Sequence, residues 1–470
     1  MRINSIGGCG IRNTDSFQIN DIKNTVMNKI KPITWCALVA LLPFIFSSCE
    51  DYLTIDEVEN RTIATDYYDS PQKLEQAVVG VYVDMRRALL HNHAWLMYGE
   101  GRAGDLTLEV DMMDDVAAQR LTNGTLPLRQ LTDWGYFYDA IQDANHLLEK
   151  LGPAKGGLLS SYQYNLYRGE ALALKSMAYF YLTRIWGAVP SAEAADRGTL
   201  LTQQEVLTRC VQWAAEAKPL LPRLLLNDDG IVSTALTEVR FNKTAVSLLL
   251  AHEQLWLGKG QEAYDGLTAV FEGQGTDSLS NFGLSLGKDS DPDITQQPYN
   301  GNPIHITKEK LEAIYPVGDT RRSMFTIPAT GTTASLIIAK QDLLMIYSTK
   351  EINLLMAEAA WRAGQLEAAK SYLTTAAAGA TENYALLTAG ATENYALLTA
   401  GTFADALLRE RQRILMGSGQ RFFDLIRFDK VGQFLPSYTE GDLAQGAAYW
   451  PLSAQSIQTN GLAQNEYWSN

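Results

Sequence analysis

The stretch "RGEALALKSMAYFYLTRIWGAVP", residues 168–190, decides the fold. Leucines, alanines and aromatic residues lie on most sides of a helix drawn over residues 163–186, and a helix with that pattern is covered by neighbours on more than one side. Gly187 and Pro190 follow directly and are expected to end it. The sequence therefore predicts a buried central helix in a mostly helical protein.

Helical patterns continue on both sides of this stretch. Residues 135–151 carry apolar side chains at three- and four-residue steps, which predicts an amphipathic helix. Residues 243–271 and 350–373 share the frame Ala-x6-Gly-x4-Ala, in which small residues let two antiparallel helices approach and the glycine lies at the turn. This is the design of tetratricopeptide repeats. The two copies lie far apart, so we expect helix pairs separated by long insertions.

The expected insertions are rich in Gly, Asp, Asn, Pro and Thr, and loops of such length in a compact domain are usually functional or disordered. They lie roughly at residues 91–133, 187–201, 222–242 and 272–342. One unit, "GATENYALLTA", occurs at 379–389 and again, unchanged, at 390–400. We interpret it as a local duplication in a connector, without chemistry of its own.

The N-terminal region reads as a targeting segment. Within residues 27–48, two lysines precede an apolar run that is shorter than the roughly 20 residues a bilayer span needs, as in a secretory signal. Small residues precede Cys49, an arrangement typical of a bacterial lipoprotein signal, so we expect cleavage before Cys49 and lipidation of its thiol. The alternative is a signal anchor with an incidental cysteine. We expect residues 1–26 to be a non-native extension and residues 49–470 to form a single helical domain.

Composition excludes some classes of function. The formal net charge is −14, which makes the chain a poor match for nucleic acid, because phosphate contacts need clustered Lys and Arg. The four cysteines show no zinc spacing, so we expect neither a metal nor a cofactor. The 22 tyrosines and 9 tryptophans are typical of cores and of sugar- or peptide-binding surfaces.

Short motifs give no catalytic site. "GEGRAG" (99–104) matches G-x-G-x-x-G, but a helical pattern precedes it where a dinucleotide fold needs a strand. "HNH" (91–93) has no acidic cluster at ligand spacing beside it. "EVDMMDD" (109–115) could hold calcium, yet it lacks the frame of a calcium loop, which favours a solvated acidic loop. There is no G-x-S-x-G or H-E-x-x-H, although a glycosidase carboxylate pair stays open.

Five segments together resemble the SusD/RagB family, the nutrient-binding outer-membrane lipoproteins of Bacteroidota. They are the lipoprotein signal with Glu50 and Asp51 after its cysteine, which look like a surface-export signal, and residues 134–151, 168–190, 407–428 and 449–468. The matching residues are Trp134, Tyr138, Ile141, Ala144 and Asn145; Arg168, Glu170, Ala171, Leu174, Leu182, Arg184, Trp186, Gly187, Val189 and Pro190; Glu410, Arg411, Leu415, Gly419, Arg421, Asp424, Leu425 and Arg427; and Pro451, Ile457, Asn460, Leu462, Gln464 and Asn465. The chain departs from the family pattern at Lys175 and Ser176, which replace Arg-Ala, and at Ile414 and Ser418, which stand where glutamates are usual.

The resemblance implies a mostly α, SusD-like fold with tetratricopeptide-type helix pairs and long loop insertions. It implies a lipid-anchored protein on the surface of the outer membrane, which captures a glycan or peptide without catalysis and delivers it to a TonB-dependent, SusC-like transporter. Two alternatives remain: a tetratricopeptide scaffold that binds only protein, and a surface glycosidase.

Candidate site residues follow from loop position and chemistry, because the family motifs do not mark them. As ligand-binding residues we select Trp95, Tyr98, Arg102, Asp105, Tyr299, Tyr315, Asp319 and Arg321. The alternative for each aromatic is core packing, and for Asp319 with Arg321 a structural ion pair. The charged residues of the matched motifs are expected to be structural, because charges among apolar residues must pair. They are Arg168, Glu170, Arg184, Arg411, Arg421 and Asp424.

Overall fold

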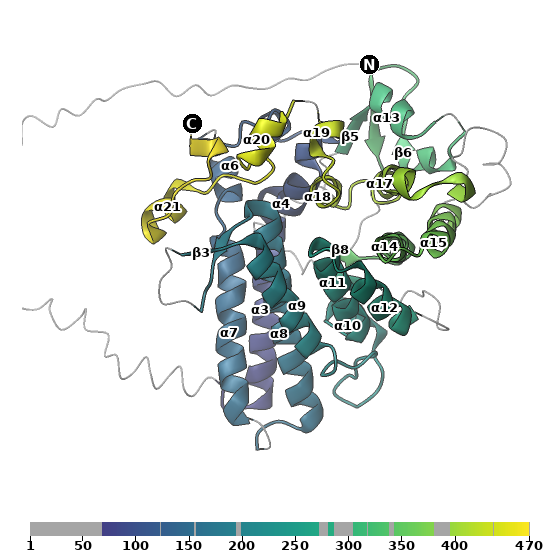
Figure 1. Cartoon of the computed structure of the whole chain (residues 1–470). Helices are drawn as coiled ribbons and strands as arrows, with labels where there is room; N and C mark the ends of the chain where they lie inside the picture. The colour runs from purple at the N-terminus through teal and green to yellow at the C-terminus, as the bar shows by residue number, and fades with distance from the viewer. Residues whose placement is uncertain are drawn as a thin grey trace, which may run out of the picture. The chain divides into compact units, whose positions relative to one another are not determined.

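A computed structural model describes residues 68–469, except 123, 155–156, 194–198, 272–280, 286–303, 317, 338–342, 380–394 and 436 (Figure 1). Residues Tyr68–Asn470 form one compact unit. The predictions for residues 1–26, the signal 27–48, Cys49 and Tyr299 lie outside the described residues, and so does most of the duplicated segment.

The central helix predicted from the sequence is α8, Ser161–Trp186, and from Leu166 onward nearly all of its side chains are buried. Ser160 begins it with a capping box to Gln163, and Gly187, with φ +76°, ends it. Three long helices pack around α8: α3 (Pro71–Leu90), α7 (Gly135–Ala154) and α9 (Gln203–Ala217) (Figure 1). The mostly helical fold class is therefore confirmed.

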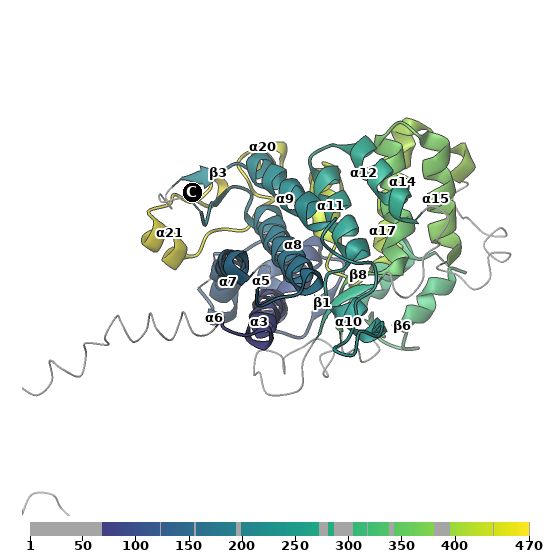
Figure 2. The ribbon, with the colours of Figure 1, turned by 90° about the horizontal axis from the view of Figure 1, so that it is seen from below.

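Two helix pairs lie beside this group, at the segments where the sequence predicts them. They are α11 (Lys243–Trp256) with α12 (Gly260–Phe271), and α14 (Thr349–Arg362) with α15 (Leu366–Gly379). Gly258 and Gly364 lie in the turns with φ +73° and +77°, values that favour glycine. Although far apart in sequence, α12 packs on α14, and α17 (Ala400–Ile414) packs on α14 and α15 (Figure 2).

Short elements fill the insertions. The helices are α4 (Ala94–Gly99), α5 (Met113–Ala117), α6 (Leu126–Leu131), α10 (Thr234–Val239) and α13 (Lys308–Ile314). An antiparallel sheet has the order β1-β5-β7-β6, from Thr107–Leu108, Ile304–Thr307, Thr333–Leu336 and Phe325–Thr326. Two further antiparallel pairs join β2 (Val189–Pro190) to β3 (Leu200–Leu201), and β4 (Phe282–Ser285) to β8 (Leu343–Tyr347).

The C-terminal region packs back against α8. It contains α18 (Arg421–Arg427), α19 (Val431–Phe434), α20 (Glu440–Ala444) and α21 (Ala454–Asn460). The Trp450 N–H donates to Ile185 O at 2.8 Å, and Trp186 Nε1 donates to Pro451 O at 3.2 Å. Segments 265 residues apart in sequence thus pack side by side.

Two kinds of feature are absent from the described ranges. None of the helices described is both long and apolar enough to cross a membrane. In the same part of the chain, no group of three or more His, Cys, Asp and Glu side chains is placed to hold a metal ion.

Candidate functional site

The predicted ligand residues of the first insertion lie largely in the core. Trp95 and Tyr98, both on α4, are 6% and 1% exposed, and Tyr98 donates its hydroxyl to Leu131 O at 2.8 Å. Arg102 is 1% exposed and donates to the carbonyls of Ala447 and Ala448, each at 2.6 Å. Arg102 thus joins the first insertion to the C-terminal region.

The second predicted group is buried as well. Tyr315 is fully buried and donates its hydroxyl to Arg413 O at 2.9 Å. Arg321 lies 2.6 Å from both Asp319 and Glu410, which is the structural ion pair that the sequence left open. Burial by itself would raise the pKa of Asp319, but the hydrogen bonds and charge of Arg321 outweigh burial and lower that pKa. Ligand contact by these residues stays a prediction, and their burial argues against it.

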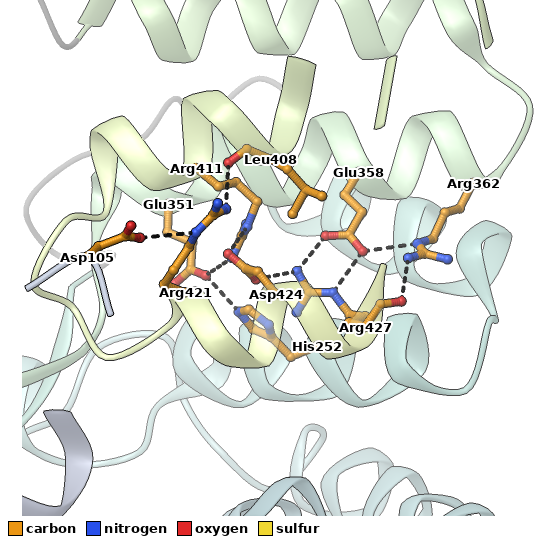
Figure 3. Close-up of polar contacts among 10 residues, drawn as sticks. All are labelled: Asp105, His252, Glu351, Glu358, Arg362, Leu408, Arg411, Arg421, Asp424 and Arg427. Carbon is orange, nitrogen blue, oxygen red and sulfur yellow. Dashed lines mark hydrogen bonds and ion pairs between the residues drawn. The ribbon is translucent and has the colours of Figure 1, made fainter. Parts of the chain in front are cut away.

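A network of buried charges joins α14, α17 and α18 (Figure 3). Arg411 lies 2.7 Å from Asp424 and 3.1 Å from Glu351. Arg427 lies 2.9 Å from Asp424 and 2.7 Å from Glu358. Each carboxylate thus faces at least one guanidinium, which offsets the desolvation of both partners.

Asp105, a predicted ligand residue, meets the network at its edge. Its Oδ2 lies 3.4 Å from Arg421 Nε, and Arg421 also donates to Leu408 O at 3.4 Å (Figure 3). Both contacts are long for a charged donor. The loose pairing of Arg421 is consistent with the absence of glutamates at Ile414 and Ser418.

The remaining motif charges have varied surroundings. Glu170 is fully buried and accepts two hydrogen bonds from Arg240, each at 2.7 Å. Arg168 lies at the surface and pairs with Glu216. Arg184 is stacked on rings instead, with its guanidinium 4.0 Å from the centroid of Phe180. Within the described part of the chain, the Arg184 guanidinium donates a hydrogen bond to Phe180 O and makes cation–π contacts with the rings of Phe180, Tyr181 and Phe423.

Glu351 connects the charge network to a cavity of about 430 Å³. The walls come from α4, the end of β7, the junction between β8 and α14, and the loop 415–420 between α17 and α18. Burial raises the pKa of Glu351, but His252 and Arg411 outweigh it and lower the value to about 2. Glu351 is therefore ionised, and it pairs with Arg411 at the wall of the cavity.

Glycines allow the loop 415–420 to approach α4. Gly417 and Gly419 have φ +78° and +74°, in the left-handed region. A Cβ at Gly419 would lie 2.7 Å from Trp95 O, and one at Gly99 would lie 1.6 Å from Gly419 O. Only glycine fits this approach, which brings the loop and Trp95 to the same cavity.

Polar groups without partners mark the cavity. Gln420 is 7% exposed, and neither its Oε1 nor Ser418 Oγ has a hydrogen-bond partner among the described residues. Leaving such a group unsatisfied costs about 1–3 kcal/mol. Met324, Met345 and Ile337 supply apolar wall around them. Apolar walls together with a few convergent polar groups are usual in small-molecule sites, and this cavity has both kinds of lining.

Two other cavities, of about 270 and 600 Å³, lie beside the start of α7 and α21 and share Asp133 and Gln455. Among their described lining residues, no buried side-chain polar atom lacks a partner. We therefore take the 430 Å³ cavity as the candidate site.

Of the residues selected from the sequence, Trp95 lines this cavity, and its contact with a ligand stays a prediction. Ser418 and Gln420 are not among the selected residues. The signal was available in "GSGQ", residues 417–420, where two glycines flank a polar residue in a loop. In the family pattern, Ser418 stands out only as a departure from a usual glutamate. Its place in the cavity depends on contacts with segments far away in the chain.

Two family profiles match this chain. One, described as "Starch-binding associating with outer membrane", matches residues 51–252, and the SusD family profile matches residues 330–468. A SusD-like protein of Formosa agariphila is 24% identical over 247 residues, which are 52% of this chain and 46% of that protein. A SusD-like protein of Bacteroides ovatus is 25% identical over 170 residues, 32% of this chain and 27% of that protein. The chain thus spans less than half the length of these relatives.

Solved structures show the same fold. A SusD superfamily protein from Bacteroides thetaiotaomicron has a TM-score of 0.69 at 23% identity, covering 85% of this chain and 99% of its own. A laminarin-binding SusD-like protein has a TM-score of 0.60 at 17% identity, covering 84% and 98%. A SusD-like carbohydrate-binding protein from Bacteroides vulgatus has a TM-score of 0.58 at 17% identity, covering 76% and 83%.

Proposed function

Because this chain belongs to the SusD/RagB family, we propose that it captures an oligosaccharide in the 430 Å³ cavity. We propose further that Cys49 anchors it by lipid at the surface of the outer membrane, and that it delivers the glycan to a SusC-like, TonB-dependent transporter. The family association with glycans and with the outer membrane supports this proposal.

The observation that carries the proposal is the pair of unpartnered polar groups at Ser418 and Gln420 in a partly apolar cavity. A sugar presents hydroxyl groups that donate and accept hydrogen bonds, and C–H faces that pack on apolar side chains. Such a ligand would satisfy both polar groups while covering Met345 and Ile337. Water alone would satisfy the polar groups but would leave the apolar side chains of the wall in contact with solvent.

The cavity favours binding over hydrolysis. Glycosidases of the usual kind need two carboxyl groups about 5–9.5 Å apart, one of them with a raised pKa. Among the described lining residues Glu351 is the only carboxylate, and its pKa is lowered to about 2. It also lies 4% exposed against Arg411, so it is poorly placed to transfer a proton.

The test is titration calorimetry of the purified protein against a panel of oligosaccharides, with Gln420→Ala as the variant. We expect at least one glycan to bind and Gln420→Ala to weaken it about tenfold, equivalent to about 1.4 kcal/mol. Gln455→Ala, an exposed glutamine at the other cavities, is the matched control.

Equal affinity of the Gln420→Ala and Gln455→Ala variants would place the glycan elsewhere. Release of shorter sugars during the titration would favour the glycosidase. Purification together with a large β-barrel transporter would support delivery, and its absence from gently solubilised membranes would count against it.

A further inference from the structure

The N-terminus of α14 lies in the wall of the same cavity. The four residues from Ser348 to Glu351 all line it. Ser348 makes no side-chain capping hydrogen bond, and the Thr349 N–H donates to Asn281 Oδ1 at 2.9 Å. Because the first N–H groups of a helix lack intrahelical acceptors, this end carries partial positive charge toward the cavity.

The side chains beside this helix end leave an excess of positive charge. Glu351 and Lys350 are the two lining residues with a formal charge. Glu351 is paired with Arg411 at 3.1 Å, so its charge is already compensated. Lys350 is exposed and makes no ion pair within the described ranges. On a chain with formal net charge −14, this is not part of a generally basic surface.

A second observation points to a ligand at this place. Gln420 is more than nine-tenths buried and lines the cavity, and its Oε1 has no hydrogen-bond partner among the described residues. Ser418 Oγ, in the same loop, is likewise buried and unpartnered in that part of the chain. Both polar groups can bind sugar hydroxyls.

We propose that the N-terminus of α14 with Lys350 forms a subsite for the anionic group of a uronate or sulfated sugar residue. This inference rests on the proposed glycan capture and names its substrate class: the captured glycan is anionic. The carboxylate or sulfate accepts from the Lys350 ammonium and the Lys350 backbone N–H, because the Thr349 and Glu351 N–H groups already donate to Asn281 Oδ1 and Ser348 O. Gln420 and Ser418 bind the neighbouring hydroxyls.

The test uses matched pairs of glycans in titration calorimetry of the whole protein. One pair is galacturonate oligomers and their methyl esters, and the other is sulfated galactan oligosaccharides and their desulfated forms. We expect the anionic member of at least one pair to bind tenfold or more tightly than its neutral partner. The pair that shows the preference tells carboxylate from sulfate.

Variants locate the preference at the subsite. Lys350→Gln should abolish the tenfold preference for the anionic partner, and Lys350→Arg should retain it. Lys259→Gln, an exposed lysine in the turn before α12, is the control for overall charge. Lys350 is exposed, so equal melting temperatures of the variants are expected and serve as a check of folding.

The outcomes separate the two proposals. Equal binding within both pairs, or a preference that survives Lys350→Gln, overturns the anionic subsite and leaves glycan capture standing. If no oligosaccharide of the panel or of either pair binds, both proposals fail.

Discussion

A network of buried charges holds Glu351 in the wall of the cavity. Arg411, Asp424 and Glu351 are each less than 5% exposed, and all three lie in one ion-pair network. Removing one member of such a network leaves its partner charged and desolvated, which costs about 3–5 kcal/mol. Exposed pairs such as Arg168 with Glu216 contribute about 0–1 kcal/mol.

Asp424→Ala should therefore lower the free energy of unfolding by about 3–5 kcal/mol, because Arg411 and Arg427 both lose a carboxylate. Urea denaturation measures the change. Glu216→Ala, which removes the partner of an exposed arginine, should cost less than about 1 kcal/mol. Equal losses in the two variants would show that the network does not stabilise the fold.

Glu253 predicts a pH dependence. Burial raises its pKa from 4.5 to about 8, against the hydrogen bond from Ser176 and the charge of Arg184. The folded state therefore holds a proton that the unfolded state releases above about pH 4.5, so the contribution of Glu253 to stability falls as the pH rises toward 8. Glu253→Gln removes this term, so its stability relative to the unmodified protein should rise between pH 5 and pH 8 and then level off. Urea denaturation of both proteins at several pH values measures this difference. A difference in the free energy of unfolding that stays constant from pH 5 to pH 8 would contradict the prediction.

The ligand residues selected from the sequence show what residue types alone can predict. Tyr98 and Arg102 lie in a predicted insertion, which favours ligand contact, yet that insertion folds onto the core. Tyr98 stands in "AWLMYG", residues 94–99, and this nearly apolar run was the available sign of burial. For Arg102 the sequence holds no such sign, because its acceptors are carbonyls near the C-terminus.

At the scale of elements, long helices were predictable and short strands were not. The pattern of apolar residues in α8 and the small residues of the two helix pairs are local signals. Strand β1 has two residues and pairs with β5 nearly 200 positions later, so its existence depends on a tertiary contact. The insertions are therefore the part of the fold that the sequence pattern left undefined.

Close packing between helix pairs can be tested within α12. A Cβ at Gly260 would lie 2.4 Å from Arg362 Cβ and 2.7 Å from its carbonyl carbon, so Gly260→Ala should destabilise the protein by about 1–3 kcal/mol. Gly266→Ala, in the same helix with nothing within 4 Å of the new Cβ, should be neutral or stabilising by up to about 1 kcal/mol. Thermal unfolding compares the two. Destabilisation by both, to the same degree, would mean that α12 does not pack on α14 this closely.

At the scale of the whole molecule, the family was predictable because its motifs are local and occur in order. The site was not, because its walls come from segments as distant as Trp95, Asn281, Lys350 and Gln420. The central helix and the paired helices hold these segments together, and Glu351 links them to the network of buried charges. We propose that a glycan fills the cavity formed by these segments.

A crystal structure of the protein with a bound oligosaccharide from the calorimetric panel tests that claim most directly. We expect a sugar unit in the 430 Å³ cavity, with hydroxyls within hydrogen-bonding distance of Gln420 and Ser418. A sugar bound instead at the cavities beside α7 and α21, with the 430 Å³ cavity holding only water, would contradict it.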